Sequence, residues 1–399
     1  SYSLEVEDMC EGQPVDKRCY FLKIPEGRSQ HTAYRHTVSR RGVYHFDAFR
    51  VATKFPFGLF NKSVKLSTET ELLVFPEIRP VQLPPPRGQR MGEHRQLGLL
   101  ALCSVDEYDA GDIKKHEYTR PDKEDDRTHH MEVLDAQVGL VFLTYQATDA
   151  LRELTAEVTA APPAWDVTTE DGVQHQLWPA PADRVDAIRQ AFARVPALYI
   201  ADGHHRSAAA SRVHAARGDA ASASFLAGLF PDDQLYVMAY NRVVHDLNGL
   251  DVQGFLGELG QVYALELTAE PLPPERGTLT MYLDGSWYLL RPHDGIVDAS
   301  DPVARLDVAV LQDRILGPVL GIDDPRRSTR VAFVGGIRGL QALQAAVDGG
   351  AAVAFHMYPT GLDQLFAVAD AGQVMPPKST WFEPKLREGV VVRSLRDED

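Results

Sequence analysis

Thirteen residues, Leu198 to Ala210, constrain the fold more than any other stretch of this chain. They read Leu-Tyr-Ile-Ala-Asp-Gly-His-His-Arg-Ser-Ala-Ala-Ala. The apolar start predicts a strand, the pair Asp202-Gly203 predicts a break, and the residues from His204 onward predict a helix. A strand that leads directly into a helix is typical of folds that pack helices and sheets in layers.

The start of this predicted helix has the properties of an anion site. The first backbone amides of a helix have no partner within it, and the macrodipole leaves partial positive charge there. Gly203 permits close approach to the backbone, and Arg206 adds a guanidinium. His204 and His205 are neighbours that diverge by about 100° on a helix, so they do not easily hold one metal ion together. We therefore predict phosphate binding at Gly203, His204, His205 and Arg206.

Asp202 has several interpretations. It could cap the helix, orient a histidine or orient a magnesium-bound water. The plainer alternative for the whole segment is a core helix capped by Asp202, with histidines that face solvent.

Charge separates the chain into two parts. The net charge of −15 argues against general nucleic-acid binding, because neutralising phosphates needs a basic surface. Residues 1–97 contain 15 Lys and Arg against 11 Asp and Glu, whereas residues 98–399 contain 26 against 45. The first part is therefore net positive and the second strongly negative.

Cysteine usage and hydropathy favour a cytoplasmic protein. The three cysteines lack CxxC spacing, so neither a disulfide framework nor a structural zinc site is indicated. No apolar run approaches the roughly 18–20 residues of a membrane span, and no signal peptide is recognisable. The sequence leaves open whether the chain forms a homodimer.

Two kinds of pattern follow each other along the chain. Alternating aromatic and β-branched residues predict strands at 43–51, 62–66 and 71–76, with a turn at Pro56 and Gly58. The run Leu83-Pro-Pro-Pro-Arg-Gly-Gln-Arg90 is typical of a linker. From Leu97 onward strands alternate with helices, the latter predicted at 183–193, 204–217, 338–346 and 362–371, and the last strand at 390–392.

These patterns predict the domain organisation and the fold class. We expect a β-rich segment of sandwich type over residues 1–90, a linker over 91–97 and an α/β domain with a phosphate site over 98–399. The fold class is α+β, with mixed α/β layers in the larger part and an all-β segment at the N-terminal end.

A second cluster precedes the strand and helix described above. His116, Glu117 and Thr119 come before a proline-punctuated turn, and Lys123 and Arg127 are four residues apart. The two cations share one face if a helix starts near residue 122. Such a segment offers a carboxylate base beside cationic phosphate ligands. The alternative is a solvated run of charges.

The third cluster is Met375-Pro-Pro-Lys-Ser-Thr-Trp-Phe-Glu-Pro-Lys385. Two prolines fix the backbone before Lys378, whose ammonium group is a point-charge ligand for phosphate. Ser379 and Thr380 add hydroxyl groups. The alternative is a rigid loop whose aromatic residues pack into the core.

At these three clusters the chain resembles the domain-of-unknown-function 1015 family, from about Leu97 to Leu395. The residues that carry the resemblance are Ile200-Ala-Asp-Gly-His-His-Arg206, Gly372-Gln-Val-Met-Pro-Pro-Lys-Ser-Thr380 and His116-Glu-Tyr-Thr119. The helix start is also similar to the phosphate-binding turn of ParB-type proteins, sulfiredoxin and free-serine kinases. This more distant resemblance implies a ParB/sulfiredoxin-like element that binds nucleotide phosphates at Gly203–Arg206.

The first part of the chain resembles another family. Residues 41–77, from Arg41-Gly-Val-Tyr to Leu73-Val-Phe-Pro-Glu77, are similar to the β-region of the domain-of-unknown-function 58 family. This region stands where the 1015 family normally has about a hundred residues of its own. If that missing segment supplies substrate contacts, the chain has lost activity and kept the phosphate site.

The resemblance implies a nucleotide-dependent kinase of a small hydroxylated molecule such as free serine, with ATP or ADP and Mg²⁺ as cofactors. Glu117 and Asp202 are the catalytic candidates, and His116 and Thr119 are candidates for substrate contact. A second set would bind nucleotide phosphates: Gly203, His204, His205, Arg206, Lys123, Arg127, Lys378, Ser379 and Thr380. The alternatives are a non-catalytic nucleotide-binding module and a metal-dependent hydrolase that uses Asp202 with His204 or His205.

Overall fold

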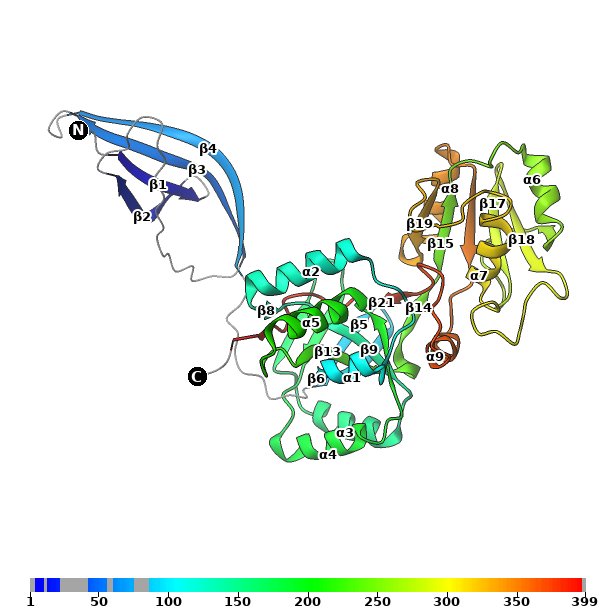
Figure 1. Ribbon diagram of the computed structural model, residues 1–399, viewed down its shortest axis with the longest axis horizontal. Coiled ribbons are helices and arrows are strands. Elements are labelled where there is room, and N and C mark those ends of the chain that lie inside the picture. Colours follow the sequence, from blue (N-terminus) through cyan, green and yellow to red (C-terminus); the bar gives the residue numbers. More distant parts are fainter. Residues whose placement is uncertain (1–3, 11–12, 22–41, 56–59, 75–85, 397–399) are drawn as a thin grey trace. The chain divides into compact units, whose positions relative to one another are not determined.

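The computed structural model describes residues 4–10, 13–21, 42–55, 60–74 and 86–396 (Figure 1). Two compact units are present, Ser1–Arg79 and Pro80–Asp399. The predicted turn at Pro56 and Gly58 and the first prolines of the predicted linker lie outside the described residues.

The boundary between the units lies earlier than the sequence predicts. Residues 91–97, expected as a linker, form the end of β5 (Pro86–Met91), a short turn and the start of β6 (His94–Ser104). These two strands pair with each other in the sheet of the larger unit. Gln89 and Gln96 are paired across this hairpin and hydrogen-bond to each other, and composition alone does not distinguish such a polar hairpin from a linker.

The described part of the smaller unit is an antiparallel sheet with strand order β2-β1-β3-β4. Its strands are β1 (Leu4–Cys10), β2 (Gln13–Phe21), β3 (Gly42–Phe55) and β4 (Phe60–Val74). β3 and β4 are long neighbours that pair from Gly42 with Val74 to Phe55 with Phe60. The all-β prediction for the N-terminal segment is thus confirmed for the described residues.

The larger unit contains an eight-stranded mixed sheet with strand order β10-β11-β5-β6-β13-β9-β12-β7. Besides β5 and β6, the strands are β7 (Ile113–Lys114), β9 (Val141–Tyr145), β10 (Trp165–Thr168), β11 (Gln174–Leu177), β12 (Leu198–Asp202) and β13 (Ser224–Pro231). β9 lies between β13 and β12, and all five of its residues are buried. A short, continuously apolar strand of this kind is typical of the middle of a sheet covered on both faces.

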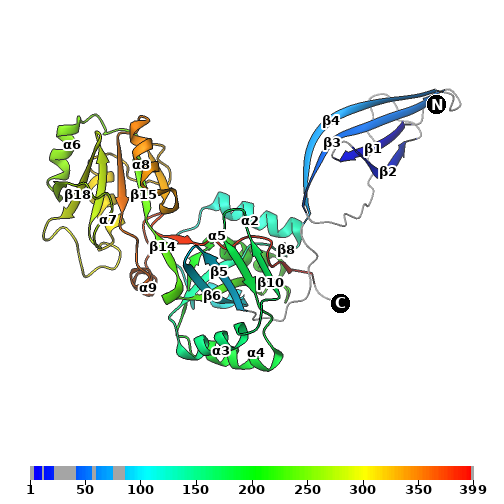
Figure 2. The ribbon, with the colours of Figure 1, turned by 180° about the vertical axis from the view of Figure 1, so that it is seen from behind.

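Five helices accompany this sheet in the described residues: α1 (Val105–Ala110), α2 (Pro121–Leu134), α3 (Asp149–Thr159), α4 (Ala182–Phe192) and α5 (His204–Arg217). Side chains of α3, α4 and α5 join one hydrophobic cluster with Leu143 and Ile200 of the sheet. Figure 1 shows α1, α2 and α5 in front of the sheet, and Figure 2 shows β5, β6 and β10 in front when the molecule is seen from behind. The helices α1 to α5 therefore cover one face of the sheet, and other parts of the chain cover the opposite face.

A second, six-stranded antiparallel sheet has strand order β16-β18-β17-β20-β15-β19. Its strands are β15 (Tyr240–Val244), β16 (Tyr263–Leu267), β17 (Leu279–Leu283), β18 (Ser286–Pro292), β19 (Val331–Gly335) and β20 (Val353–Met357). Its α-helices are α6 (Val252–Leu259), α7 (Asp307–Leu311), α8 (Gly339–Asp348) and α9 (Leu362–Asp370). In β20, Phe355 packs in the cluster with α6, α7 and α9, whereas Ala354 packs with α8, so helices lie on both faces.

The chain then returns from the second sheet to the first. β21 (Trp381–Glu383) pairs with β14 (Tyr236–Met238), and β22 (Arg393–Ser394) pairs with β8 (Ala136–Gln137). Between these pairings Leu386 and Val391 pack on the helix-free face, against buried leucines that include Leu100 and Leu226. This C-terminal segment covers part of the face that α1 to α5 leave open, and Phe366 of α9 stacks on Tyr199 of the same face.

The structure confirms the α+β fold class. The strand and helix predicted at Leu198–Ala210 are present as β12 and α5, and the helix predicted at 362–371 is present as α9. The strand predicted at 390–392 is wrong, because the backbone pairs with β8 only from Arg393 and Val391 instead makes side-chain contacts. Among the described residues no helix is long and apolar enough to cross a membrane.

Candidate functional site

The turn from β12 to α5 depends on glycine. Gly203 has φ = 97°, a left-handed conformation that residues with a Cβ rarely adopt. Its carbonyl oxygen accepts hydrogen bonds from the amides of Arg206 and Ser207, at 2.8 and 3.1 Å, which start the helix. A Cβ at this position would also lie 3.4 Å from Val141 Cα. The turn is therefore compact. The first backbone amides of α5 follow directly after it and have no hydrogen-bond partner within the helix.

Asp202 does not cap α5, contrary to one of its predicted interpretations. Gly203 occupies the N-cap position, and no side chain caps the helix. Asp202 ends β12, and its Oδ2 accepts a hydrogen bond of 2.8 Å from Lys385 Nζ. Burial raises the pKa of Asp202, but Lys385 and Arg206 outweigh burial and hold that pKa below its usual value. Asp202 is thus an ionised carboxylate paired with a lysine from the C-terminal segment.

A cleft of about 460 Å³ lies at this turn. Its lining comes from the segment before and within α2, the start of α5, the second sheet and the C-terminal segment. The lining residues predicted from the sequence are Glu117, Lys123, Arg127, Asp202, Gly203, His204, His205, Arg206 and Lys378. The second sheet and the segment before it add Pro325, Arg326, Ser328, Val331 and Phe333. The structure therefore brings together residues from all three sequence clusters.

The cations of the cleft differ in what they bind. Lys123 and Lys378 form no ion pair within the described part of the chain, and Lys378 is exposed. Lys378 also has φ = 62°, an unusual conformation for a residue with a side chain. α2 begins at Pro121, so Lys123 and Arg127 lie one turn apart on the helix, as the spacing predicts. These two lysines are the cations most available to an added anion.

Arg206 already has partners. Its Nη2 donates a hydrogen bond of 2.8 Å to Glu388 Oε1, and its Nη1 donates one of 3.2 Å to the carbonyl oxygen of Leu140. A Cβ on Gly139 would lie 2.8 Å from Arg206 Nε, so the guanidinium packs closely over this glycine. Burial raises the pKa of Glu388, but the contact with Arg206 outweighs it and lowers that pKa below its usual value. Arg206 therefore links α5 to the C-terminal segment as well as facing the cleft.

Glu117 is a half-buried carboxylate that lines the cleft. Burial raises its pKa above the usual range, Lys378 and Lys385 lower it, and Asp202 raises it further. A carboxylate whose pKa is raised is a stronger base than an exposed one. Glu117 therefore combines access to the cleft with increased proton affinity.

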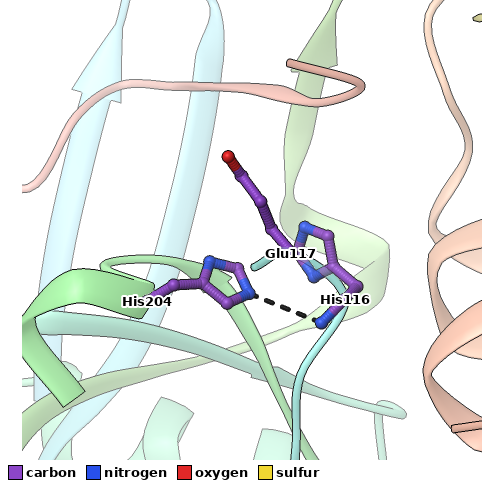
Figure 3. Close-up of side chains that lie close together, drawn as sticks. All are labelled: His116, Glu117 and His204. Atoms are coloured by element: carbon purple, nitrogen blue, oxygen red, sulfur yellow. Dashed lines mark hydrogen bonds between the residues drawn. The ribbon is translucent and has the colours of Figure 1, made fainter. Parts of the chain in front are cut away.

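His204 lines the cleft beside Glu117, and His116 packs against it from behind. His116 and His204 are both buried, with ring centroids 4.5 Å apart and ring planes at 87°. The backbone amide of His116 donates a long hydrogen bond, 3.5 Å, to His204 Nε2 (Figure 3). His205 points elsewhere, since its Nε2 accepts a hydrogen bond of 3.1 Å from the Arg120 amide. His204 and His205 thus have separate environments, as their adjacent positions on a helix predict.

Four predicted residues do not line the cleft. His116 lies behind it, and Thr119 Oγ1 instead donates a hydrogen bond to Glu124. Ser379 is buried, and its Oγ donates a hydrogen bond of 2.6 Å to the carbonyl oxygen of Pro376. Thr380 is half-buried beside it. The Ser379 hydroxyl therefore stabilises the loop that presents the lysine.

Sequence reasoning assigned no role to Lys385, Glu388 or Phe333. Lys385 is the last residue of the third cluster, so the sequence analysis included it. Its partner Asp202, however, is 183 residues away in the chain. Glu388 is 182 residues from Arg206. Phe333 belongs to an apolar strand with no local mark of a binding site. Only the folded arrangement brings Phe333 into the cleft lining and places Lys385 and Glu388 against Asp202 and Arg206.

A comparison with protein families gives one match, to a family described as "Protein of unknown function (DUF1015)", over residues 87–309. The match spans more than half of the 399 residues and confirms the predicted resemblance. It includes the turn at Gly203 but ends before Lys378 and Lys385. Among curated proteins, none matches the sequence. The similarity of residues 41–77 to the domain-of-unknown-function 58 family stays a prediction.

Several solved structures are distantly similar. SbnI with a C-terminal truncation, from Staphylococcus aureus, is 13% identical with a TM-score of 0.40, and the match covers 75% of this chain and 90% of that one. A free serine kinase in complex with AMP is 11% identical with a TM-score of 0.37, over 71% and 86%. A conserved hypothetical protein from Pyrococcus furiosus is 11% identical with a TM-score of 0.37, over 72% and 94%. These values are too low to transfer a ligand or an activity to this chain.

Proposed function

We propose, from the premise that this chain belongs to the DUF1015 family, that its cleft binds a nucleotide and transfers a phosphoryl group to the hydroxyl of a small molecule. The observation that carries the proposal is that the start of α5, two lysines and a carboxylate line one cleft: Gly203, Lys123, Lys378 and Glu117. Phosphoryl transfer depends mainly on positioning and on electrostatic stabilisation, which these groups supply. Free serine is the acceptor that the sequence resemblance favours.

The phosphates are proposed to bind at the first turn of α5. Its amides and the helix macrodipole favour an anion there, and Gly203 lets the anion approach the backbone. Lys123 and Lys378 line the same cleft without ion-pair partners among the described residues. In a chain of net charge −15, such a local excess of positive charge is a specific feature of the site.

The wall from the second sheet fits the rest of a nucleotide. Val331, Phe333 and Pro325 provide apolar surface, and Arg326 and Ser328 provide polar groups next to it. Pockets for small ligands commonly combine apolar walls with a few polar groups that fix orientation. We therefore assign the base and ribose to this wall and the phosphates to α5.

Glu117 is the proposed general base. It accepts the proton as the O–H bond of the acceptor breaks, while the acceptor oxygen bonds to phosphorus and the bond from phosphorus to the leaving phosphate oxygen breaks. The raised pKa of Glu117 suits this role, because burial increases its proton affinity. Lys123 and Lys378 offset negative charge on the transferred group and the leaving phosphate.

Mg²⁺ would accompany ATP or ADP. This ion prefers oxygen ligands and is usually held by one or two carboxylates together with phosphates and water. Glu117 and Asp202 are the carboxylates of the cleft lining, so the donor set fits. Asp202 would hold the ion and leave Glu117 as the base. When bound, Mg²⁺ neutralises charge on the phosphates.

Phosphorus NMR of the full chain with Mg²⁺ and ATP or ADP, with and without serine, tests the proposal. We expect a phosphoserine signal. Glu117→Gln keeps the shape of the side chain but removes the base, so turnover should fall by about 10²–10⁴-fold while nucleotide affinity stays within a few-fold. Glu132→Gln, at an exposed position of α2, is the control and should change neither quantity.

Each of the other possible outcomes of this experiment favours a different function or refutes part of the proposal. Nucleotide binding without any transfer would replace the kinase by a non-catalytic binding module. Release of phosphate without phosphoserine would favour the hydrolase alternative. An active wild type whose rate is unchanged by Glu117→Gln would remove Glu117 from the mechanism, and absence of nucleotide binding would refute the proposal as a whole.

A further inference from the structure

Three potential metal ligands lie close together at and just behind the lining of the cleft. One ligand atom each of His116, Glu117 and His204 can be chosen so that all three atoms lie within 4.8 Å of one another. Figure 3 shows the rings of His116 and His204 side by side, with the Glu117 side chain extending past them. We propose that these residues form a binding site for a divalent transition-metal ion of the Zn²⁺ class.

The spacing is close to what an ion requires. The centre of a triangle with sides of 4.8 Å lies about 2.8 Å from each corner, whereas Zn²⁺ binds nitrogen and oxygen at about 2.0–2.2 Å. Each ligand atom therefore has to move by less than about 1 Å, which small rotations of the side chains provide.

Both histidines are buried polar side chains. Only 2% of His116 is exposed, and within the described residues neither of its ring nitrogens makes a hydrogen bond of normal geometry, although the backbone of Ile200 is near. Such buried, unsatisfied polar atoms are unfavourable, and a metal ion would supply a partner.

The donor set indicates the class of ion. Two imidazoles and one carboxylate are a set that Zn²⁺ uses at sites that keep an open coordination position, whereas Mg²⁺ and Ca²⁺ prefer oxygen ligands. Glu117 and His204 line the cleft, so an ion can enter from solvent and exchange its remaining ligands there. The site is therefore distinct from the Mg²⁺ that would accompany a nucleotide.

This inference goes beyond the proposed function and does not depend on it, because metal binding is measured without nucleotide or acceptor. Both roles use Glu117, so the metal-bound state and the free-base state exclude each other. Zn²⁺ is therefore expected to inhibit any phosphoryl transfer. Metal binding by a chain that transfers no phosphate would refute the proposed function alone.

The test uses the full chain, stripped of metal by a chelator that is then removed. Calorimetric titration with Zn²⁺ should give one ion per chain, and Co²⁺ should give the intense visible absorption of a four- or five-coordinate site. His116→Gln and His204→Gln should each weaken Zn²⁺ binding by 100-fold or more. His205→Gln is the matched control on the same helix turn and should stay within about threefold of the wild type.

Two results would overturn the proposal. One is a wild-type chain that binds no stoichiometric Zn²⁺ and gives only the weak absorption of hydrated Co²⁺. The other is a loss of binding in His205→Gln equal to that in the two ligand variants, which would indicate a general effect on α5. If a buried histidine variant fails to fold by circular dichroism, the half-buried Glu117→Gln and the wild-type Co²⁺ spectrum still decide.

Discussion

Lys378 has two opposing effects: its backbone conformation lowers the stability of the fold, and its charge favours nucleotide binding. One substitution separates these effects. Its φ of 62° places a residue with a Cβ in the left-handed region, at a cost of about 1–2 kcal/mol. Glycine removes that cost, but it loses about 0.5–1 kcal/mol more conformational entropy on folding. Lys378→Gly should therefore raise the free energy of unfolding by roughly 0.5–1 kcal/mol. The same change removes an unpaired ammonium from the cleft and should weaken nucleotide binding about tenfold, or about 1.4 kcal/mol.

Denaturant unfolding and calorimetric titration with ADP measure the two effects on the same preparations. Lys378→Met is the control, because it removes the charge and keeps the backbone conformation. It should weaken ADP binding as much as Lys378→Gly does, without the gain in stability. The reasoning is refuted if Lys378→Gly is less stable than Lys378→Met, or if both variants bind ADP as the wild type does.

Three further substitutions test the turn and a buried carboxyl. Gly203→Ala and Gly218→Ala should each lower the free energy of unfolding by about 1–2 kcal/mol, since both glycines have positive φ. Only Gly203→Ala should weaken ADP binding, because Gly218 lies at the other end of α5, and equal effects on binding would contradict the assignment of the site. Burial raises the pKa of Asp307 to about 6, so between about pH 4 and 6 the folded state binds more protons than the unfolded state, and stability falls as pH rises. Asp307→Asn can still accept the hydrogen bond from the Gly277 amide. At pH 7 its free energy of unfolding, measured with denaturant, should exceed that of the wild type by about 1–3 kcal/mol, and this difference should disappear near pH 4. A difference independent of pH would refute this prediction.

Local signals made part of the molecule predictable. The strand and helix at Leu198–Ala210 combine an apolar run, a glycine break and an alanine-rich segment, each of which acts within a few residues. The spacing of Lys123 and Arg127 likewise needs only the start of one helix at Pro121. Such patterns depend on neighbouring residues, so the sequence is sufficient to detect them.

Other features depend on contacts between distant residues. The role of Asp202 is set by Lys385, and the orientation of Arg206 is set by Glu388, through pairings that no local pattern encodes. Thr119 and Ser379 looked like ligands by residue type, yet each hydroxyl binds a neighbour in the chain. Residue type and spacing therefore identified most of the predicted lining residues, but not that the hydroxyl groups of Thr119 and Ser379 bind within the chain.

The C-terminal segment has a consequence for how the protein is made. Lys378, Lys385 and Glu388 all follow the second sheet in the chain, and Leu386 and Val391 cover apolar residues of the first sheet. During synthesis the first sheet leaves the ribosome long before this segment does, so its helix-free face and the cleft are both incomplete at that stage. The nascent chain is therefore expected to need protection from aggregation, and to become competent for ligand binding only after the segment from Lys378 to Val391 has emerged.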